Sequence, residues 1–282
     1  MSMNRRRFLA YFGAGAAGGL AGGSLASMRR RDNPRPEPSR KAAESDLITP
    51  ASTGTQRIIW SVDTEEPVAA VTFDDGPDPE FTPRILDLLN RFEAKATFMV
   101  MGYNAVTHPE LLREIAEAGH EIGGHGWKHL NLTRTSAEET RREIQHGIRV
   151  IEERTGIPIR VFRPPYGRFG ENAVRVLARS RPDLVVWSVT RGMLSWREPE
   201  YISSHILNAL GPGDIVDLHD GIGRATFNRH SESGRRIRRR REDELSALPG
   251  ILGGAKAKGL RLETVSDLMA SWQAPAEHDA PE

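Results

Sequence analysis

Short apolar runs alternate with amphipathic segments along the chain from Val68 onward. Each apolar run ends in polar or turn-forming residues, as a buried strand does, and the next segment carries apolar residues at helical spacing. This alternation is typical of parallel β/α units. Strands are expected at residues 68–73, 96–100, 121–123, 161–163, 184–189, 215–219 and 260–263. Helices are expected at residues 83–92, 109–118, 137–154, 172–179, 201–210, 245–258 and 265–270.

Seven predicted strands, each followed by a helix, indicate an α/β barrel with one unit fewer than the usual eight. A chain of 282 residues is long enough for one such domain with a large core. The polar residues with candidate chemistry fall at or just after the carboxyl ends of the strands. Barrel enzymes assemble their active sites at that end, so these residues are expected to converge.

The first thirty residues have the pattern of an export signal. The run Arg-Arg-Arg-Phe-Leu at residues 5–9 precedes an Ala/Gly-rich stretch that extends to about Ala26, which resembles a twin-arginine signal. This stretch is too short and too rich in glycine for a good membrane-spanning helix, which needs about 20 apolar residues. Membrane contact is therefore expected only during export. A basic tail with an accidental pattern is the alternative.

The chain is expected to divide into four parts. Residues 1–27 form the export signal, with cleavage near Ala26, and residues 28–56, rich in Arg, Pro, Ser and Thr, form a flexible linker. Residues 57–272 form one catalytic domain, and residues 273–282 form a disordered tail. The mature protein is therefore expected outside the cytoplasm, in the extracellular space or at the cell wall.

The charge distribution argues against nucleic acid as a partner. The formal net charge is +1, but six arginines stand before any acidic residue, so the chain after position 31 carries −5. A mildly acidic body does not favour nucleic-acid binding. The chain has no cysteine, which excludes disulfides, thiolate catalysis and cysteine-ligated zinc. Any metal ion must be held by histidine and carboxylate.

Two clusters have the residue types of a metal site. Asp74 and Asp75 directly follow the first strand and precede a Gly-Pro turn. One carboxylate could bind a metal ion while the other remains a base, although Asp-Gly-Pro is also ordinary turn chemistry. His125 and His129 are four residues apart, so both rings can face one ion. Histidines at this spacing often bind no metal. The acidic cluster at another strand end is what favours a metal site here.

Two further clusters could supply the rest of an acid–base site. Arg163 ends a strand before a Pro-Pro-Tyr-Gly turn, where it could pair with a carboxylate while backbone N–H groups point inward. The same turn could equally be only structural. A later strand ends in Asp217, Leu218 and His219, and this histidine is a candidate general acid.

The four clusters stand in the order found in the NodB-type polysaccharide deacetylases of carbohydrate esterase family four. The chain resembles that family over about residues 68–270. Each motif alone is weak, but four in order at successive strand ends are specific. The resemblance implies a distorted (β/α)7 barrel as a single catalytic domain and a bound divalent metal ion, usually zinc. The implied metal ligands are Asp75, His125 and His129.

The resemblance also implies the remaining roles. Asp74 is the expected catalytic base, Arg163 its partner, and His219 the catalytic acid. The backbone N–H of Tyr166 is expected to help hold the oxyanion. The implied reaction is hydrolysis of N-acetyl groups on a polysaccharide such as peptidoglycan or chitin oligomers. Further residues expected to line the substrate site are Trp196, Leu218 and Asp217.

The chain departs from the family pattern beside the expected acid. The family usually has Asp-Trp where this chain has Ser195-Trp196, and an earlier family Asp corresponds to Thr190. A neutral serine cannot raise an imidazole pKa as a carboxylate does. Asp217 stands where the family normally has Leu, and it shares a strand face with His219. One hypothesis is that Asp217 replaces the missing Asp and hydrogen-bonds the ring of His219, directly or through one water. The alternative is a distorted strand end with weak or altered activity.

Two other segments depart from the pattern or lie outside it. Gly126 stands between the two histidines, where the family commonly has Ser or Thr supporting the loop. The arginine-rich run at residues 235–241 falls in a long expected connection. A solvated loop neutralised by Glu242, Asp243 and Glu244 is one interpretation of this run. The other is contact with an anionic wall polymer.

Two rival functions remain open from the sequence. The barrel could bind carbohydrate with little or no activity, because of the changes at Ser195 and Asp217. It could also keep its activity and act on O-acetyl esters or small cyclic amides, since fold alone does not fix the substrate. The complete set of candidate catalytic residues favours the deacetylase over the inactive barrel.

Overall fold

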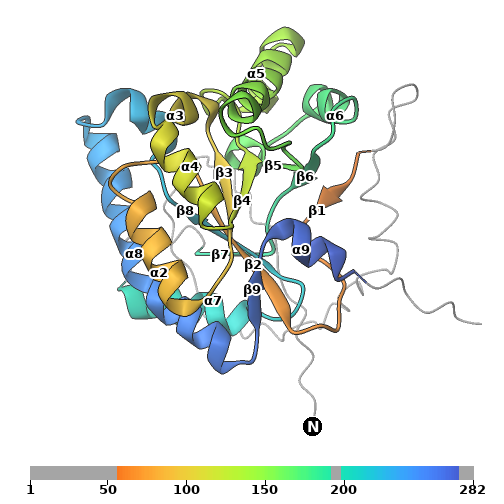
Figure 1. Cartoon of the computed structure of the whole chain (residues 1–282). Helices are drawn as coiled ribbons and strands as arrows, with labels where there is room; N and C mark the ends of the chain where they lie inside the picture. Colours follow the sequence, from red (N-terminus) through yellow and green to blue (C-terminus); the bar gives the residue numbers. More distant parts are fainter. Residues whose placement is uncertain (1–55, 192–197, 273–282) are drawn as a thin grey trace, which may run out of the picture. The chain divides into compact units, whose positions relative to one another are not determined.

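The computed structural model describes residues 56–191 and 198–272. Its centre is a nine-stranded sheet in which every paired neighbour is parallel (Figure 1). The strand order is β1-β6-β5-β4-β3-β2-β8-β7, and β9 pairs with the start of β2. The strands are β1 Ile58–Ile59, β2 Val68–Asp74, β3 Thr97–Val100, β4 Glu121–Gly124, β5 Val161–Phe162, β6 Asp183–Val185, β7 Val189–Thr190, β8 Ile215–His219 and β9 Arg261–Glu263.

One short segment supplies strands to the two ends of this order. The predicted strand at 184–189 is two strands, because the chain leaves β6, next to β1, and enters β7, next to β8, after three intervening residues. Val186 N–H donates to the carbonyl of Ile59, and Ser188 N–H donates to the carbonyl of Ile215. The two ends of the sheet are thereby brought together. The predicted α/β class and distorted (β/α)7 barrel are confirmed, with short strands at the closure.

The helices follow the strands as expected, with additional short turns at the carboxyl ends. Helix α5 begins with a capping box between Ser136 and Glu139 and ends at Gly156 in the left-handed conformation. The α-helices are α2 Thr82–Phe92, α3 Gly102–Thr107, α4 Pro109–Glu117, α5 Ala137–Thr155, α6 Glu171–Leu177, α7 Pro199–Ala209, α8 Glu232–Ala257 and α9 Val265–Ala270. The 3₁₀ turns are η1 Leu132–Arg134, η2 Pro165–Gly167 and η3 Gly223–Asn228.

Helix α8 is much longer than the predicted helix at 245–258. It begins after Ser231, whose side-chain oxygen accepts a hydrogen bond from Gly234 N–H, so the arginine-rich run lies in its first half. The interpretation of residues 235–241 as a loop is therefore wrong. The helix packs against α7 and α2, beside which it lies in Figure 1. Its buried residues are Gly234, Arg241, Glu244, Leu245, Ala247, Leu248, Ile251, Leu252 and Ala255.

Strand β2 lies at the centre of the sheet and is buried along its whole length. Its apolar residues pack between the sheet and the helices, and a strand buried on both faces reads as a continuous apolar run. The chain then turns at Gly76, where an added Cβ would lie 2.0 Å from the carboxylate of Asp220. Only glycine fits this close approach, which lets Asp75 turn toward the cavity at the strand ends.

No helix in the two described segments is long and apolar enough to cross a membrane. The predicted signal at 1–27, nearly all of the predicted linker at 28–56, and the predicted tail at 273–282 lie outside the described residues. Ser195 and Trp196 also lie outside them.

Candidate metal centre and acid–base site

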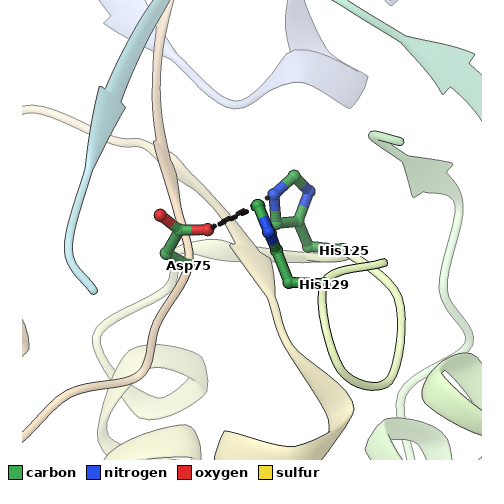
Figure 2. Close-up of side chains that lie close together, drawn as sticks. All are labelled: Asp75, His125 and His129. Carbon is green, nitrogen blue, oxygen red and sulfur yellow. Dashed lines mark ion pairs between the residues drawn. The ribbon is translucent and has the colours of Figure 1, made fainter. Parts of the chain in front are cut away.

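Three predicted metal ligands converge at the carboxyl ends of β2 and β4. Asp75 Oδ1 lies 3.0 Å from Nε2 of His129 and 3.6 Å from Nε2 of His125. Figure 2 shows the carboxylate of Asp75 facing both rings, from a strand end on one side and the His125–His129 loop on the other. One ligand atom from each residue lies within 4.8 Å of the other two, and all three residues are buried.

The orientation of His125 is fixed by its second ring nitrogen. Nδ1 of His125 lies 2.8 Å from the backbone carbonyl of Arg163, so it carries the proton and donates it there. Nε2 is then left with its lone pair facing Asp75. Metal-binding histidines commonly use one ring nitrogen in this way, which fixes the tautomer and the ring plane.

The donor set fits a divalent metal ion. Oδ1 of Asp75 and Nδ1 of His129 are buried without a hydrogen-bond partner among the described residues. Burial opposes the charge on Asp75, but His129 and His125 outweigh it and hold the pKa of this carboxyl well below its usual range. One carboxylate and two imidazoles are ligands that zinc accepts. A cation at this position would give the buried oxygen and the two Nε2 atoms a shared partner.

The backbone is strained at the residues that form the centre. Asp75, His129 and Tyr166 have φ angles of 78°, 58° and 63°. Non-glycine residues in this region cost on the order of 1–3 kcal/mol each and persist where the surroundings hold them. The fold therefore orients these side chains at a cost in folding free energy.

The loop between the histidines is held by a carboxylate from α5. Oε1 of the buried Glu143 accepts from the N–H groups of Lys128, at 2.7 Å, and Leu130, at 2.9 Å. A Cβ at Gly126 would lie 3.0 Å from that oxygen, and this glycine has a φ of 80°. Glu143 therefore supports the loop that the family commonly supports with a hydroxyl at position 126.

Asp74 stays separate from the Asp75 carboxylate and is held by Arg163. Nη1 of the fully buried Arg163 donates to Asp74 Oδ1 at 2.7 Å and to Thr72 Oγ1 at 2.6 Å. The Arg163 guanidinium also lies 5.5 Å from the ring centre of Trp187. The other oxygen of Asp74 lies 3.6 Å from Nε2 of His125. One oxygen of Asp74 is thus fixed by arginine while the other faces the metal centre.

His219 at the end of β8 has a carboxylate partner from α8. Oε2 of Glu244 lies 3.1 Å from Nδ1 of His219. Burial and Arg241 lower the pKa of His219, but Glu244 and Asp217 outweigh them, so this pKa is raised. Burial opposes the charge on Glu244, yet His219, Arg241 and Arg191 lower its pKa to about 2. Glu244 is therefore an anion across the ordinary pH range.

Arg241 connects the two halves of the site. Its Nη2 donates to Oδ2 of Asp75 at 3.0 Å, its Nη1 to Oε1 of Glu244 at 3.2 Å, and its Nε to the carbonyl of Gly221. Arg191, fully buried, also donates to Oε1 of Glu244 at 3.0 Å. Each charge in this group is paired, as burial requires.

The direct hydrogen bond predicted between Asp217 and His219 is not found among the described residues. The Asp217 carboxylate instead lies 3.4 Å from Nη1 of Arg163 and 3.5 Å from Oγ1 of Thr190, both long contacts. Burial and the nearby Asp74 raise the pKa of Asp217 to about 6. The i, i+2 relation gives both side chains the same face of β8, but the hydrogen bond to His219 comes from Glu244, which approaches from α8.

A cavity of about 540 Å³ opens over these residues. Asp74, Asp75, both histidines, Asp217, His219 and Tyr166 line it. Leu218 does not line it: the side chain points to the other face of β8 and is buried in the main core. The Tyr166 ring is half exposed and lies edge-on over His129, with ring centres 4.4 Å apart.

Five residues of the site could not be predicted from a motif: Glu244, Arg241, Arg191, Trp187 and Glu143. A signal for two of them was present. Leu248 is one helical turn after Glu244, which is itself three residues after Arg241, so the apolar stripe of the last large helix extends back through both.

A curled parallel barrel that gathers an Asp-His-His set, a separate carboxylate and an imidazole in one cavity defines a class of metal-dependent hydrolases. A family model described as polysaccharide deacetylase matches residues 61–181. The chain is 34% identical over 214 residues to a peptidoglycan-N-acetylglucosamine deacetylase of Bacillus cereus, which covers 75% of this chain and 92% of that protein. The chain therefore belongs to the polysaccharide deacetylase family, carbohydrate esterase family four.

Other relatives agree with this membership. The peptidoglycan-N-acetylmuramic acid deacetylase PdaC of Bacillus subtilis is 34% identical over 160 residues, which cover 57% of this chain and 34% of PdaC. The solved structure of the Bc1960 peptidoglycan N-acetylglucosamine deacetylase has a TM-score of 0.67 at 30% identity, covering 76% of this chain and 94% of that one. A family pseudoenzyme from Bacillus anthracis, at 22% identity and a TM-score of 0.66 over 80% of this chain and 72% of that one, shares the fold alone.

Proposed function

We propose that the protein hydrolyses the acetamide groups of an N-acetylated polysaccharide such as peptidoglycan or chitin oligomers, with zinc as the metal ion. The observation that carries this proposal is the cavity in which Asp75, His125 and His129 face one point while Asp74 and His219 border it. Relatives named as peptidoglycan-N-acetylglucosamine, peptidoglycan-N-acetylmuramic acid and chitooligosaccharide deacetylases support the substrate class.

The metal ligands in this proposal are Asp75, His125 and His129. A divalent ion bound there supplies Lewis acidity toward a carbonyl oxygen and makes water more acidic. The protein's part is to hold the ligands still. The Arg163 carbonyl orients His125, Arg241 holds the second oxygen of Asp75, and Glu143 fixes the loop that carries His129.

Asp74 acts as the general base. Its Oδ1 is held by Arg163, and its Oδ2 is directed toward the metal centre, where it can accept a proton from the attacking water. The buried guanidinium orients this carboxylate through a charge-assisted hydrogen bond.

His219 acts as the general acid that protonates the departing sugar amine. An acid must be protonated before transfer, and Glu244 favours the imidazolium form. The hydrogen bond from Nδ1 to Glu244 also leaves Nε2 as the ring nitrogen available to substrate. Glu244 thus performs the positioning task that the family's Asp performs at the position of Ser195 in this chain.

The remaining substrate contacts stay predictions. Tyr166 has a positive φ and its ring packs against His129, and its backbone N–H is proposed to hold the negative charge that develops on the carbonyl oxygen. Trp187, Ile222 and Ala225 give the cavity an apolar lining that suits an acetyl methyl group. Trp196 is predicted to contribute to the same wall. Leu218, buried in the core, acts at most by supporting β8.

The site is proposed to work outside the cytoplasm. The twin-arginine-like run at residues 5–9 supports export, and the relatives named for peptidoglycan support a location at the cell wall. Residues 1–27 would be the signal, residues 28–56 a linker, residues 57–272 the catalytic domain, and residues 273–282 a tail.

Acetate release from three polymers tests the proposal. The zinc-loaded protein is incubated with peptidoglycan, chitin oligomers and acetylxylan, each with and without prior treatment of the protein with a chelator. Chelator-sensitive release from an N-acetylated polymer supports the proposed function. Release from acetylxylan alone would assign an O-acetyl esterase. No release from any of the three would favour a carbohydrate-binding barrel without activity.

A further inference from the structure

A second, smaller cavity of about 350 Å³ lies beside the metal centre and is lined by arginines. Arg134, Arg168 and Arg224 line it together with Asn131 and Tyr166. We call it the arginine pocket. Tyr166 and Arg224 also line the central cavity, so the two cavities share a wall. Whatever fills the arginine pocket is therefore adjacent to a sugar in the central cavity.

The three arginines come from separate segments that converge at the strand ends. Arg134 ends η1, Arg168 follows η2, and Arg224 lies in η3. The segments carrying Arg134 and Arg168 have fixed ends, because the Asn131 side chain accepts from Thr133 N–H and Arg168 N–H donates to the Pro165 carbonyl. The guanidinium groups thus gather because of the barrel topology and not because of neighbouring sequence.

Among residues 56–191 and 198–272, no acidic residue lines the arginine pocket. In the parts of the chain that the structure describes, Arg134 and Arg224 form no ion pair, and both side chains are exposed. By contrast, Arg241 in the central cavity donates to Asp75, Glu244 and the Gly221 carbonyl. The like charges of Arg134 and Arg224, which no ion pair neutralises in the described part of the chain, raise the local potential and attract an anion. A guanidinium group suits a carboxylate, which it can bind with two parallel hydrogen bonds.

We infer that the arginine pocket binds a carboxylate carried by the polymer next to the acetamide that is hydrolysed. The substrate class is then an acidic N-acetylated polymer, whose carboxylates belong to its sugars or to peptides attached to them, and neutral chitin is the poorer substrate. This inference rests on the proposed function, because it assigns a neighbour to the sugar held at the metal centre. Arg134, Arg168 and Arg224 determine specificity and take no part in proton transfer.

Chemically matched substrates test the inference. Peptidoglycan fragments are treated with hydrofluoric acid, which removes polymers linked through phosphate, and half of the sample is then converted to neutral amides at its carboxylates. The quantity measured is the ratio of kcat/KM for the acidic fragments to kcat/KM for the amidated fragments. We expect a ratio well above one that falls as ionic strength rises, because exposed charges are screened by salt.

Arginine variants test whether the substrate carboxylate binds in the arginine pocket. Arg134→Gln and Arg224→Gln are each expected to lower the ratio by about threefold to tenfold, chiefly through KM, as lost charged hydrogen bonds at an exposed site do. Arg91→Gln removes the same charge from the exposed end of α2 and is expected to leave the ratio unchanged. Thermal unfolding of each variant verifies that its fold is intact.

The outcomes separate this inference from the proposed function. A ratio near one with ready acetate release, or a ratio that these variants leave unchanged, overturns the arginine pocket and leaves the deacetylase intact. Loss of preference in Arg240→Gln, which lines the central cavity alone, without loss in Arg134→Gln would place the anion elsewhere and also overturn it. A kcat/KM that falls on hydrofluoric acid treatment, with a ratio near one between the acidic and amidated fragments, would assign phosphate as the anion and contradict the carboxylate. No acetate from any N-acetylated polymer contradicts the proposed function itself.

Discussion

Oε2 of Glu244 lies 3.1 Å from Nδ1 of His219, and the two residues come from different elements, α8 and β8. The Glu244 side chain is almost fully buried, while that of His219 is about one fifth exposed toward the cavity. The pair therefore has the geometry of a buried carboxylate that orients a histidine at the edge of an active site. Glu244 on α8 thus provides the negative charge that the family's Asp provides at the position where this chain has Ser195.

The first prediction concerns the pH dependence that Glu244 imposes. Glu244→Gln removes the anion that raises the pKa of His219, so the general acid loses its proton at lower pH. The alkaline limb of the kcat profile is expected to move to lower pH. At alkaline pH we expect kcat to fall by roughly tenfold or more, because general acid catalysis contributes about 10²–10⁴-fold. Steady-state kinetics measure kcat from about pH 5 to about pH 10, a range that includes the titration of a histidine with a raised pKa.

Two further variants make the test of Glu244 specific. Glu244→Asp keeps the charge and should restore part of the alkaline activity. Glu242 lies two residues earlier on α8 and pairs with Arg84 at the surface, so Glu242→Gln should leave the pH profile of kcat unchanged. Since Glu244 also neutralises Arg191 and Arg241, the melting temperature of each variant is measured first. An unshifted alkaline limb in a folded Glu244→Gln protein would show that this carboxylate does not tune the acid.

The second prediction concerns the loop that carries His129. Glu143→Leu removes the acceptor of the Lys128 and Leu130 N–H groups and is expected to weaken zinc binding by about 10–100-fold, as loss of an outer support does. Glu143→Gln keeps an acceptor oxygen of the same shape and is expected to lose less. Competition with a chromophoric chelator gives the zinc affinities. Equal affinities in the parent and Glu143→Leu proteins would refute the assigned support.

The third prediction concerns the stability cost of Asp217. Its pKa is raised to about 6 in the fold, so the folded protein retains a proton that the unfolded chain releases near pH 4. Stability therefore falls as pH rises from about 4 to about 6 and stays lower above that range. Asp217→Asn removes the ionisable group and is expected to stabilise the metal-free protein by up to about 2 kcal/mol at pH 8, but hardly at pH 4.

Urea unfolding of the chelator-treated protein at the two pH values measures this cost. Asp63→Asn, at an exposed position, serves as the control and is expected to give the same small effect at both pH values. A destabilising effect of Asp217→Asn at pH 8 would mean that the contact with Arg163 outweighs burial.

The fourth prediction concerns export. Replacing Arg5 and Arg6 by Lys keeps the positive charge of the leader but removes the guanidinium pair, so the protein is expected to remain in the cytoplasm. Immunoblots of cytoplasmic and culture fractions measure the distribution. Secretion equal to that of the parent would show that another pathway reads the leader.

Much of the fold could be predicted because β/α alternation is visible in the local pattern of apolar and polar residues. The strand 215–219 matches β8, and the helices at 83–92 and 137–154 lie within one residue of α2 and α5. The strand predicted at 184–189 failed for a physical reason. Its apolar residues are continuous, but the chain crosses between the two ends of the sheet within it, and hydrophobicity does not record which partner a strand has.

The site could be predicted only where chemistry follows a strand directly. Asp74, Asp75, His125, His129, Arg163 and His219 all stand at strand ends or in the loops that follow, and the structure brings them to one cavity or its wall. Glu244 and Arg241 come from a helix whose arginine-rich first half has the composition of a solvated loop. Their burial depends on the carboxylate of Asp75, just after β2, and on the imidazole of His219 at the end of β8, which no local pattern reveals.

The most direct test of the central claim separates metal binding from turnover. Asp74→Asn removes the base but no metal ligand, whereas His129→Ala removes a ligand. Bound zinc and acetate release from an N-acetylated oligosaccharide are measured on both variants and the parent. The parent is expected to bind one zinc and release acetate, Asp74→Asn to bind zinc with turnover lowered by about 10²–10⁴-fold, and His129→Ala to lose both. Full activity of Asp74→Asn, or acetate release by the parent that a chelator leaves unchanged, would contradict the central claim.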